Sequence, residues 1–107
     1  MSEKTICSAE DLIENSGVCA LIGETQVALF YLPDTEQKVF ALANWDPLGK
    51  ANVMSRGIVG NVGDELVVAS PLYKQHFSLT TGQCIEEEAT LATYDVALEN
   101  DVVVLKS

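Results

Sequence analysis

Short apolar runs separated by turn residues recur along the whole chain, and this pattern constrains the fold more than any other feature of the sequence. Two pairs of runs flank connections that contain Gly23 or Gly63, which is typical of β-hairpins. The pattern therefore predicts an all-β protein. The predicted strands are Val18–Ile22, Gln26–Leu32, Val39–Ala43, Ile58–Val62, Leu66–Ala69, His76–Leu79, Thr93–Leu98 and Val102–Lys106.

One short helix is predicted before the first of these strands. Ser8 is a favourable N-cap residue, and Asp11, three residues later, forms an imperfect capping box with it. Leu12 and Ile13 follow directly, and we expect both side chains to face the core.

The size of the chain bounds its organisation. Its 107 residues predict a single domain, residues 1–107, and 48% of them are hydrophobic, which is enough for one core. No apolar run approaches the roughly 20 residues that a membrane helix needs. The N-terminus lacks a basic region followed by an apolar stretch, so we expect no signal peptide and a cytoplasmic location.

Acidic residues far outnumber basic ones in this chain. There are 16 Asp and Glu against 6 Lys and Arg, for a formal net charge of −10. Nucleic-acid binding requires clustered Lys and Arg that neutralise phosphates, and an anionic membrane surface repels an acidic protein. We therefore expect neither nucleic acid nor a membrane as a partner. The acidity is consistent with solubility alone or with a protein partner that carries a basic patch.

The chain offers few groups for catalysis. Its one histidine, His76, begins a strand-like run, which favours a partly exposed strand residue over a ligand or catalytic base. Cys7, Cys19 and Cys84 are odd in number and widely spaced, so we expect three reduced thiols, with Cys19 packed as a small hydrophobe. The seven glycines form no phosphate-binding loop. We therefore expect no catalytic and no cofactor-binding residue.

Two segments, Asn44–Asn52 and Ser70–Gln75, fit neither a strand nor a helix. Each directly follows a predicted strand, and each carries a proline near its start, Pro47 in the first and Pro71 in the second. Loops on a rigid β frame usually carry function. These two segments are therefore the candidate functional site.

Both segments resemble the loops with which Rieske proteins hold a [2Fe–2S] cluster through two cysteines and two histidines. In that family the loops read C-x-H and C-P-x-H. Asn44 and Asp46 occupy the ligand positions of the first loop here, and Ser70 and Tyr73 occupy those of the second. These residues do not form an iron–sulfur ligand set, so the resemblance implies a domain without a metal.

The resemblance also implies a fold and an arrangement of the two loops. The fold is the Rieske-like [2Fe-2S] ferredoxin fold, a β-sandwich or partly open barrel. Both loops should lie close together at one end of it, because they supply one cluster in the cluster-bearing members.

Within the Rieske-like proteins, the chain resembles the small subunits of bacterial NAD(P)H nitrite reductases, which have this length and lack the cluster ligands. The motif Ser55-Arg56-Gly57 is the most specific part of this resemblance, because it has no obvious role in core packing. Met54, beside it, is expected in the core. The other stretches that carry the resemblance are Gly17–Leu21, Asp46-Pro47, Leu66–Leu72 and Lys74-Gln75.

This second resemblance implies a function and a partner. In that family the large subunit holds FAD, a [4Fe–4S] cluster and sirohaem, and it reduces nitrite to ammonium with electrons from NAD(P)H during nitrate assimilation. The cofactors supply the chemistry. The chain is therefore expected to be a non-catalytic small subunit whose partner is the large subunit.

Five residues are expected to contact that partner: Trp45, Pro47, Arg56, Pro71 and Tyr73. Aromatic side chains often anchor interfaces, but Trp45 and Tyr73 fit equally well as packing between the loops or as filling for the place of a cluster. Arg56 fits either a carboxylate of the partner or an internal salt bridge with one of the chain's own acids.

Two other functions stay open at the level of sequence. One is a Rieske-type ferredoxin that carries electrons, which the missing ligands disfavour. The other is an acidic β adaptor module without any link to nitrite reduction, which the composition alone allows.

Overall fold

The computed structural model describes residues 4–72 and 75–106, and the regular structure of this part consists of β-strands and two short 3₁₀ turns. Tyr73 and Lys74 lie outside the described residues. The elements are β1 (Lys4–Ser8), η1 (Ala9–Asp11), β2 (Ser16–Ile22), β3 (Thr25–Tyr31), β4 (Val39–Ala43), β5 (Trp45–Asp46), β6 (Ala51–Asn52), η2 (Met54–Arg56), β7 (Ile58–Val62), β8 (Glu65–Ala69), β9 (His76–Ser78), β10 (Thr93–Tyr94), β11 (Val96–Glu99) and β12 (Val102–Leu105).

An antiparallel sheet with the strand order β10-β4-β3-β2 forms the middle layer of the molecule. Residues 27–30 of β3 are all buried, and so are residues 39–42 of β4. A strand that is covered on both faces has no solvent face to fill with polar residues. This explains why both segments read as continuous apolar runs and not as an alternating pattern.

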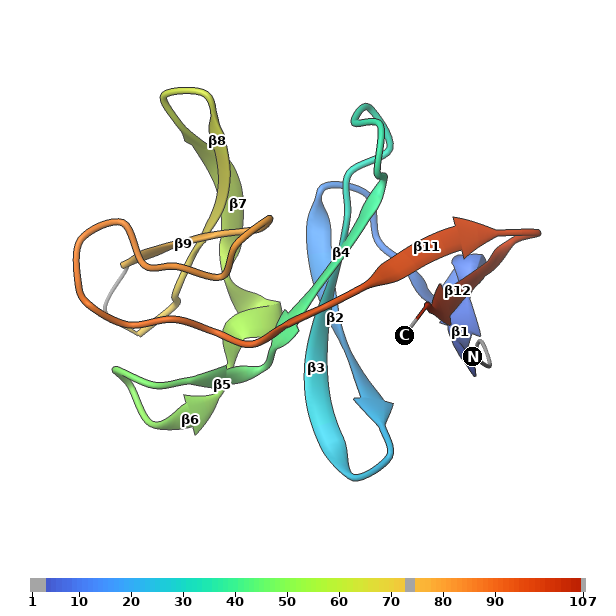
Figure 1. Cartoon of the computed structure of the whole chain (residues 1–107), viewed down its shortest axis with the longest axis horizontal. Helices are drawn as coiled ribbons and strands as arrows, with labels where there is room; N and C mark the ends of the chain where they lie inside the picture. The colour runs from blue at the N-terminus through green and yellow to red at the C-terminus, as the bar shows by residue number, and fades with distance from the viewer. Residues whose placement is uncertain (1–3, 73–74, 107) are drawn as a thin grey trace.

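The two faces of this sheet pack against different sheets. Phe30, Phe40 and Leu42 belong to a core cluster that also contains Val68 of β8 and Phe77 of β9. The other face packs against the β1-β12-β11 sheet. The core residues on that second side include Leu29, Val39, Ala41, Val96 and Val103. The fold is therefore a stack of three β layers, with β7–β9 and the β5–β6 hairpin at one end (Figure 1).

Most predicted strands are confirmed, and two of them, Val39–Ala43 and Ile58–Val62, have the predicted bounds. The prediction of one strand over Thr93–Leu98 is wrong. Thr93 and Tyr94 pair with β4 in the middle layer, whereas Val96–Glu99 pairs with β12 in the outer layer. The chain passes from one layer to the next at Asp95, whose carbonyl accepts a hydrogen bond from the backbone of Lys106 at 2.8 Å.

The predicted N-terminal helix is only a single 3₁₀ turn. The capping box is confirmed. The Ser8 backbone N–H donates to Oδ2 of Asp11 at 3.2 Å, and the Ser8 hydroxyl accepts from the backbone N–H of Glu10 at 3.2 Å. The backbone becomes extended at Leu12, which packs against the core. The expectation that Ile13 also faces the core is wrong: it lies beyond the turn and is 58% exposed.

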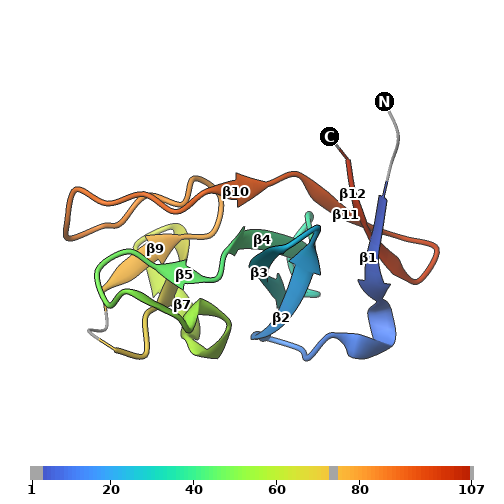
Figure 2. The ribbon, with the colours of Figure 1, turned by 90° about the horizontal axis from the view of Figure 1, so that it is seen from below.

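The first and last strands, β1 and β12, lie at the end of the molecule opposite the two candidate loops. The antiparallel pairing of β1 and β12 brings Lys4 next to Leu105. In both views this pair of strands lies at one end of the long axis, whereas β5, β7 and β9 lie at the other (Figures 1 and 2). The candidate loops are therefore well separated from both ends of the chain.

Candidate functional site

The two candidate loops touch through a buried hydrogen bond. The Ser70 hydroxyl of the second loop donates to Oδ2 of Asp46 in the first loop, and both side chains are buried. Leu72 of the second loop also lies directly over Gly49 of the first, so closely that a Cβ at residue 49 would overlap it. The prediction that the loops lie close in space is confirmed. We call the first loop, Asn44–Asn52, and the second, Ser70–Leu72, together the loop end.

Asp46 also holds the shape of its own loop. Its Oδ1 accepts hydrogen bonds from the backbone N–H groups of Leu48 at 2.9 Å and of Gly49 at 3.0 Å. This is an Asx turn, a local geometry that an Asp-Pro sequence favours. The loop, predicted to be irregular, contains the short β5–β6 hairpin, in which Asp46 pairs with Ala51.

Asn44 joins the loop end to the middle sheet. Its side-chain Nδ2 donates to Oε1 of Gln26 at 3.1 Å and to the carbonyl of Asn52 at 3.2 Å. Its Oδ1 accepts from the backbone of Ser55 at 2.7 Å, and its own carbonyl accepts from Met54 at 3.0 Å. A buried amide with its donors and acceptor satisfied in this way is a structural group.

These side chains do not fit a Rieske [2Fe–2S] cluster. Such a cluster requires two thiolates and two imidazoles, whereas Asn44, Asp46 and Ser70 supply an amide, a carboxylate and a hydroxyl. All three already hydrogen-bond to protein groups. The fourth predicted position, Tyr73, lies outside the described residues. Within the described part of the chain, no three His, Cys, Asp or Glu side chains gather as a metal site either.

The Ser55-Arg56-Gly57 motif has a packing role that sequence reasoning missed. Ser55 donates its backbone N–H to Asn44, and a Cβ at residue 57 would overlap the Ala69 carbonyl and come within 2.6 Å of a Val68 methyl group. Met54 is fully buried, as predicted. Only Arg56 of the motif is exposed, so only its side chain is available to a partner.

The other predicted partner residues lie at the surface of the loop end. Trp45 is 47% exposed and pairs with Asn52 across the β5–β6 hairpin. Pro71 is exposed, and Pro47 is half-buried. Asp46 and Ser70 provide a buried contact between the two loops.

A pocket of about 410 Å³ opens beside the second loop, on the outer face of the β7–β8–β9 sheet. Sequence reasoning singled out Arg56, Pro71 and Ser70 but missed the contribution of the sheet. The lining residues are Arg56, Ile58, Ala69, Ser70, Pro71 and His76.

His76 forms hydrogen bonds with Glu86 at the edge of this pocket. Its Nδ1 lies 2.6 Å from Oε2 of Glu86, and its backbone N–H donates to Oε1 at 2.8 Å. These hydrogen bonds, led by the one from the backbone, hold the pKa of Glu86 below its usual range. As predicted, His76 is a partly exposed strand residue, and Glu86, Glu87 and Glu88 are exposed.

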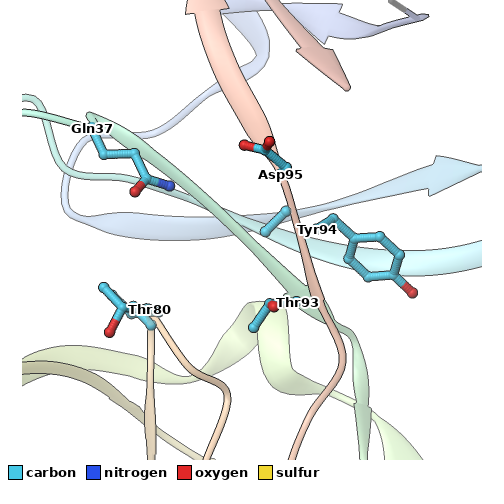
Figure 3. Close-up of a pocket in the computed structure, with 7 residues that line it drawn as sticks. Gln37, Thr80, Thr93, Tyr94 and Asp95 are labelled. Carbon is cyan, nitrogen blue, oxygen red and sulfur yellow. The ribbon is translucent and has the colours of Figure 1, made fainter. Parts of the chain in front are cut away.

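Two further pockets lie away from the loop end. One, of about 240 Å³, lies beside β4 and β10; Gln37, Thr80, Thr93 and Asp95 contribute to its polar lining (Figure 3). The other, of about 540 Å³, is lined in part by Cys7 and Cys19. All three cysteines are free, as expected.

The two cysteines beside the larger pocket differ in environment. Burial, with the nearby Asp11 carboxylate, raises the pKa of the Cys7 thiol and so disfavours its reactive thiolate form. The expectation that Cys19 packs as a small hydrophobe is wrong, since it is exposed. Its neighbours in β2, Val18 and Ala20, pack against the core. Because successive side chains of a strand point to opposite faces of the sheet, the Cys19 side chain lies on the face away from this core cluster.

No helix in the described residues is long and apolar enough to cross a membrane.

The profile of the Rieske-like [2Fe-2S] domain family matches residues 4–106 of the chain. The nitrite reductase (NADH) small subunit of Escherichia coli (strain K12) is 42% identical over 104 residues, which are 96% of this chain and 95% of that protein. The chain belongs to the Rieske-like family of nitrite reductase small subunits.

Two other relatives extend this assignment. The solution structure of the nitrite reductase [NAD(P)H] small subunit from Erwinia carotovora is 43% identical, with a TM-score of 0.80 over 98% of this chain and 82% of that one. The nitrite reductase [NAD(P)H] large subunit of Klebsiella oxytoca is 41% identical over 101 residues, which are 94% of this chain and 10% of that protein. In that relative, a small-subunit domain is thus part of the large-subunit polypeptide.

Proposed function

We propose that this chain is the non-catalytic small subunit of a cytoplasmic NAD(P)H-dependent nitrite reductase. The observation that carries the proposal is the hydrogen bond between Asp46 and Ser70, which joins the two loops where cluster-bearing Rieske domains hold iron. The family membership supports the assignment to this complex, and this bond supports a subunit that contributes a binding surface rather than a redox group.

In this proposal the chemistry belongs to the large subunit. That subunit holds FAD, a [4Fe–4S] cluster and sirohaem, and it reduces nitrite to ammonium during nitrate assimilation. The small subunit supports it by binding, and none of its own side chains contacts nitrite.

The loop end is the proposed docking surface. Trp45 offers a half-exposed aromatic side chain, and the side chains of Arg56 and Pro71 are exposed. Hydrogen bonds that the side chains of Asp46 and Asn44 accept from the backbone N–H groups of Leu48 and Ser55 hold the backbone of this region in place. A rigid surface binds more tightly than a mobile one, because less conformational entropy is lost on association.

The alternative of an electron carrier requires a redox group that the described side chains do not fit. Iron analysis and a visible spectrum of the purified chain after anaerobic reconstitution distinguish the two functions. We expect no iron and no charge-transfer bands. Two irons per chain with visible absorption would support the electron carrier.

The docking surface is tested by measuring the affinity of the purified large subunit for variants of this chain. A buried interface aromatic contributes about 2 kcal/mol or more, so Trp45→Ala should weaken binding roughly thirtyfold. It should also raise the concentration of small subunit needed for nitrite-dependent NADH oxidation.

Two control variants complete this test. Leu21→Ala removes an apolar side chain that is 60% exposed on β2, and Glu87→Lys changes the exposed acidic run. Both should bind almost normally. Normal binding by Trp45→Ala combined with loss of binding by Glu87→Lys would place the docking surface on the acidic run instead.

A further inference from the structure

Three residues line up across the outer face of the sheet that follows the first loop. Ile58 of β7 pairs in register with Ala69 of β8, and Ala69 pairs with His76 of β9. Residues that pair across neighbouring strands project to the same face of a sheet. We call Ile58, Ala69 and His76 the outer row; all three line the 410 Å³ pocket beside the second loop.

Ile58 and Ala69 of the outer row present an apolar surface that the described part of the chain does not cover, and His76 borders it. Ile58 is 77% exposed, although its neighbour Val59 packs against the core. Strand residues alternate between faces, so burying Val59 places Ile58 on the outside, where a polar residue would be the usual choice. A single exposed apolar side chain is common on a protein surface, but Ile58 lines a pocket together with Ala69 and Pro71, which makes this surface the candidate contact site.

Arg56 and Pro71 border the same end of the outer row. Arg56 lies two residues before Ile58, and Pro71 lies two residues after Ala69. Because β7 and β8 are antiparallel, these two positions lie at the same end of the strand pair. The pocket thus combines an apolar floor with one exposed guanidinium group.

The guanidinium group of Arg56 has no carboxylate partner within residues 4–72 and 75–106. This is notable in a chain with 16 acidic residues and 6 Lys and Arg. The internal salt bridge considered for Arg56 is absent from this described part of the chain. The arginine is therefore free to form a bidentate pair with a carboxylate from another molecule.

We propose that this pocket receives a segment of the large subunit in which an apolar side chain lies next to a carboxylate. The apolar side chain packs on the outer row, and the carboxylate pairs with Arg56. This inference rests on the proposed function and specifies the chemistry of its docking surface. A second copy of this chain is a poorer occupant, because two molecules that each carry a net charge of −10 repel each other.

Charge and apolar contact are tested separately by binding measurements with the purified large subunit. Arg56→Glu should weaken binding at least about thirtyfold, the loss expected when one partner of a buried charge pair is reversed. Lys4→Glu is its control, because it makes the same change in net charge on an exposed β1 residue at the opposite end of the molecule. Ile58→Asp should weaken binding by a similar factor. Leu21→Asp, which changes an exposed apolar side chain of β2, should not weaken it.

The carboxylate is tested directly by carbodiimide coupling of an Arg56→Lys variant to the large subunit. Carbodiimide joins an amine to a carboxylate but does not couple a guanidinium group. We expect a covalent complex whose cross-linked peptide pairs position 56 with an Asp or Glu of the large subunit, identified by mass spectrometry. Wild-type protein should give no cross-link at this position.

The outcomes separate this inference from the proposed function. If the wild-type chain does not bind the large subunit, the proposed function fails, and this inference fails with it. If wild type binds but Arg56→Glu and Ile58→Asp bind equally well, only the pocket assignment fails. If wild type is a dimer by light scattering and Ile58→Asp makes it a monomer, the occupant is a second copy, and the inference is wrong.

Discussion

The Asp46 side chain connects the two loops of the candidate site. In cluster-bearing Rieske domains, the metal centre makes this connection. The Oδ1 of Asp46 accepts two backbone N–H groups of its own loop, and its Oδ2 accepts the Ser70 hydroxyl of the other. A fully buried carboxylate is stable only with such partners. The side chain is therefore a structural crosslink, and its loss should affect folding before it affects binding.

Replacing this carboxylate should destabilise the protein. Asp46→Ala leaves the hydroxyl and two N–H groups without an acceptor, and we expect a loss of about 2 to 3 kcal/mol in the free energy of unfolding. Urea denaturation followed by circular dichroism measures it. Asp34→Ala, at an exposed turn, is the control and should change stability by less than about 0.5 kcal/mol. Equal stability of both variants would mean that Asp46 does not hold the loops together.

The hydrogen bonds between His76 and Glu86 make a pH-dependent contribution to stability. The pKa of Glu86 is lowered in the folded state from the ordinary value of 4.5, chiefly by the backbone N–H of His76. A carboxylate with a lowered folded pKa stabilises the fold above its unfolded pKa, and the effect is lost as the pH falls through the folded value. The contribution is small, because Glu86 is largely exposed.

We therefore expect Glu86→Gln to be slightly less stable than wild type at pH 7, by under about 1 kcal/mol. The difference should shrink to nothing below the folded pKa of Glu86, because wild type then also carries a neutral side chain. Denaturation curves at pH 7 and at pH 3 give the comparison, and Glu87→Gln should match wild type at both. A difference that persists unchanged at pH 3 would contradict this assignment.

At the scale of elements, η2 is the piece that connects the loop end to the rest of the molecule. Its first residue, Met54, fills the core, and its neighbour Ser55 hydrogen-bonds to Asn44. Gly57 then lets the chain pass closely over β8. The motif that seemed free of any packing role thus uses two of its three residues to place the third, Arg56, at the surface.

The close passage at Gly57 predicts a contrast between this glycine, which directly precedes β7, and Gly60 within β7. Gly57→Ala should cost about 1 to 3 kcal/mol, because its Cβ would overlap the Ala69 carbonyl, which is backbone and cannot rotate away. Gly60→Ala meets no atom within 4 Å and should be neutral or slightly stabilising. Thermal unfolding of both variants tests this. Equal melting temperatures would show that β8 can move away from η2 at little cost.

At the scale of the whole molecule, the three layers separate β1 and β12, the first and last strands, from the proposed docking surface. β1, β12 and β11 form one outer layer, and the loop end with β7–β9 forms the other (Figure 2). The principal-axis extents are 36 × 30 × 23 Å, and the two regions lie at opposite ends of the longest one. This arrangement would leave the loop end unobstructed if the chain were joined to a longer polypeptide at β1 or β12.

Joining this chain to the large subunit by a flexible linker from either terminus should therefore preserve assembly. The linker makes binding intramolecular, so nitrite-dependent NADH oxidation should stay constant on dilution, whereas the unlinked pair should lose activity below its dissociation constant. The matched control is a fusion that carries Arg56→Glu, which should retain less activity. An inactive wild-type fusion beside an active unlinked pair would contradict the separation of the two ends.

The sequence by itself determined the elements and the family. Gly23 and Gly63 mark hairpin connections, the apolar runs on either side of them became strands, and the residue types at Asn44, Asp46 and Ser70 sufficed to disfavour a cluster. These properties depend on local conformational preference and on side-chain chemistry, both of which can be read from residues close together in the chain.

Only the tertiary structure decided how distant residues combine. The hydrogen bond between Asp46 and Ser70 joins positions 24 residues apart, and the outer row unites three strands through their register. The division of Thr93–Leu98 between two layers was equally invisible, since both halves have the local pattern of a strand. Local periodicity indicates which face of a strand is apolar, but not what that face meets, because the packing of sheets depends on residues far apart in the chain.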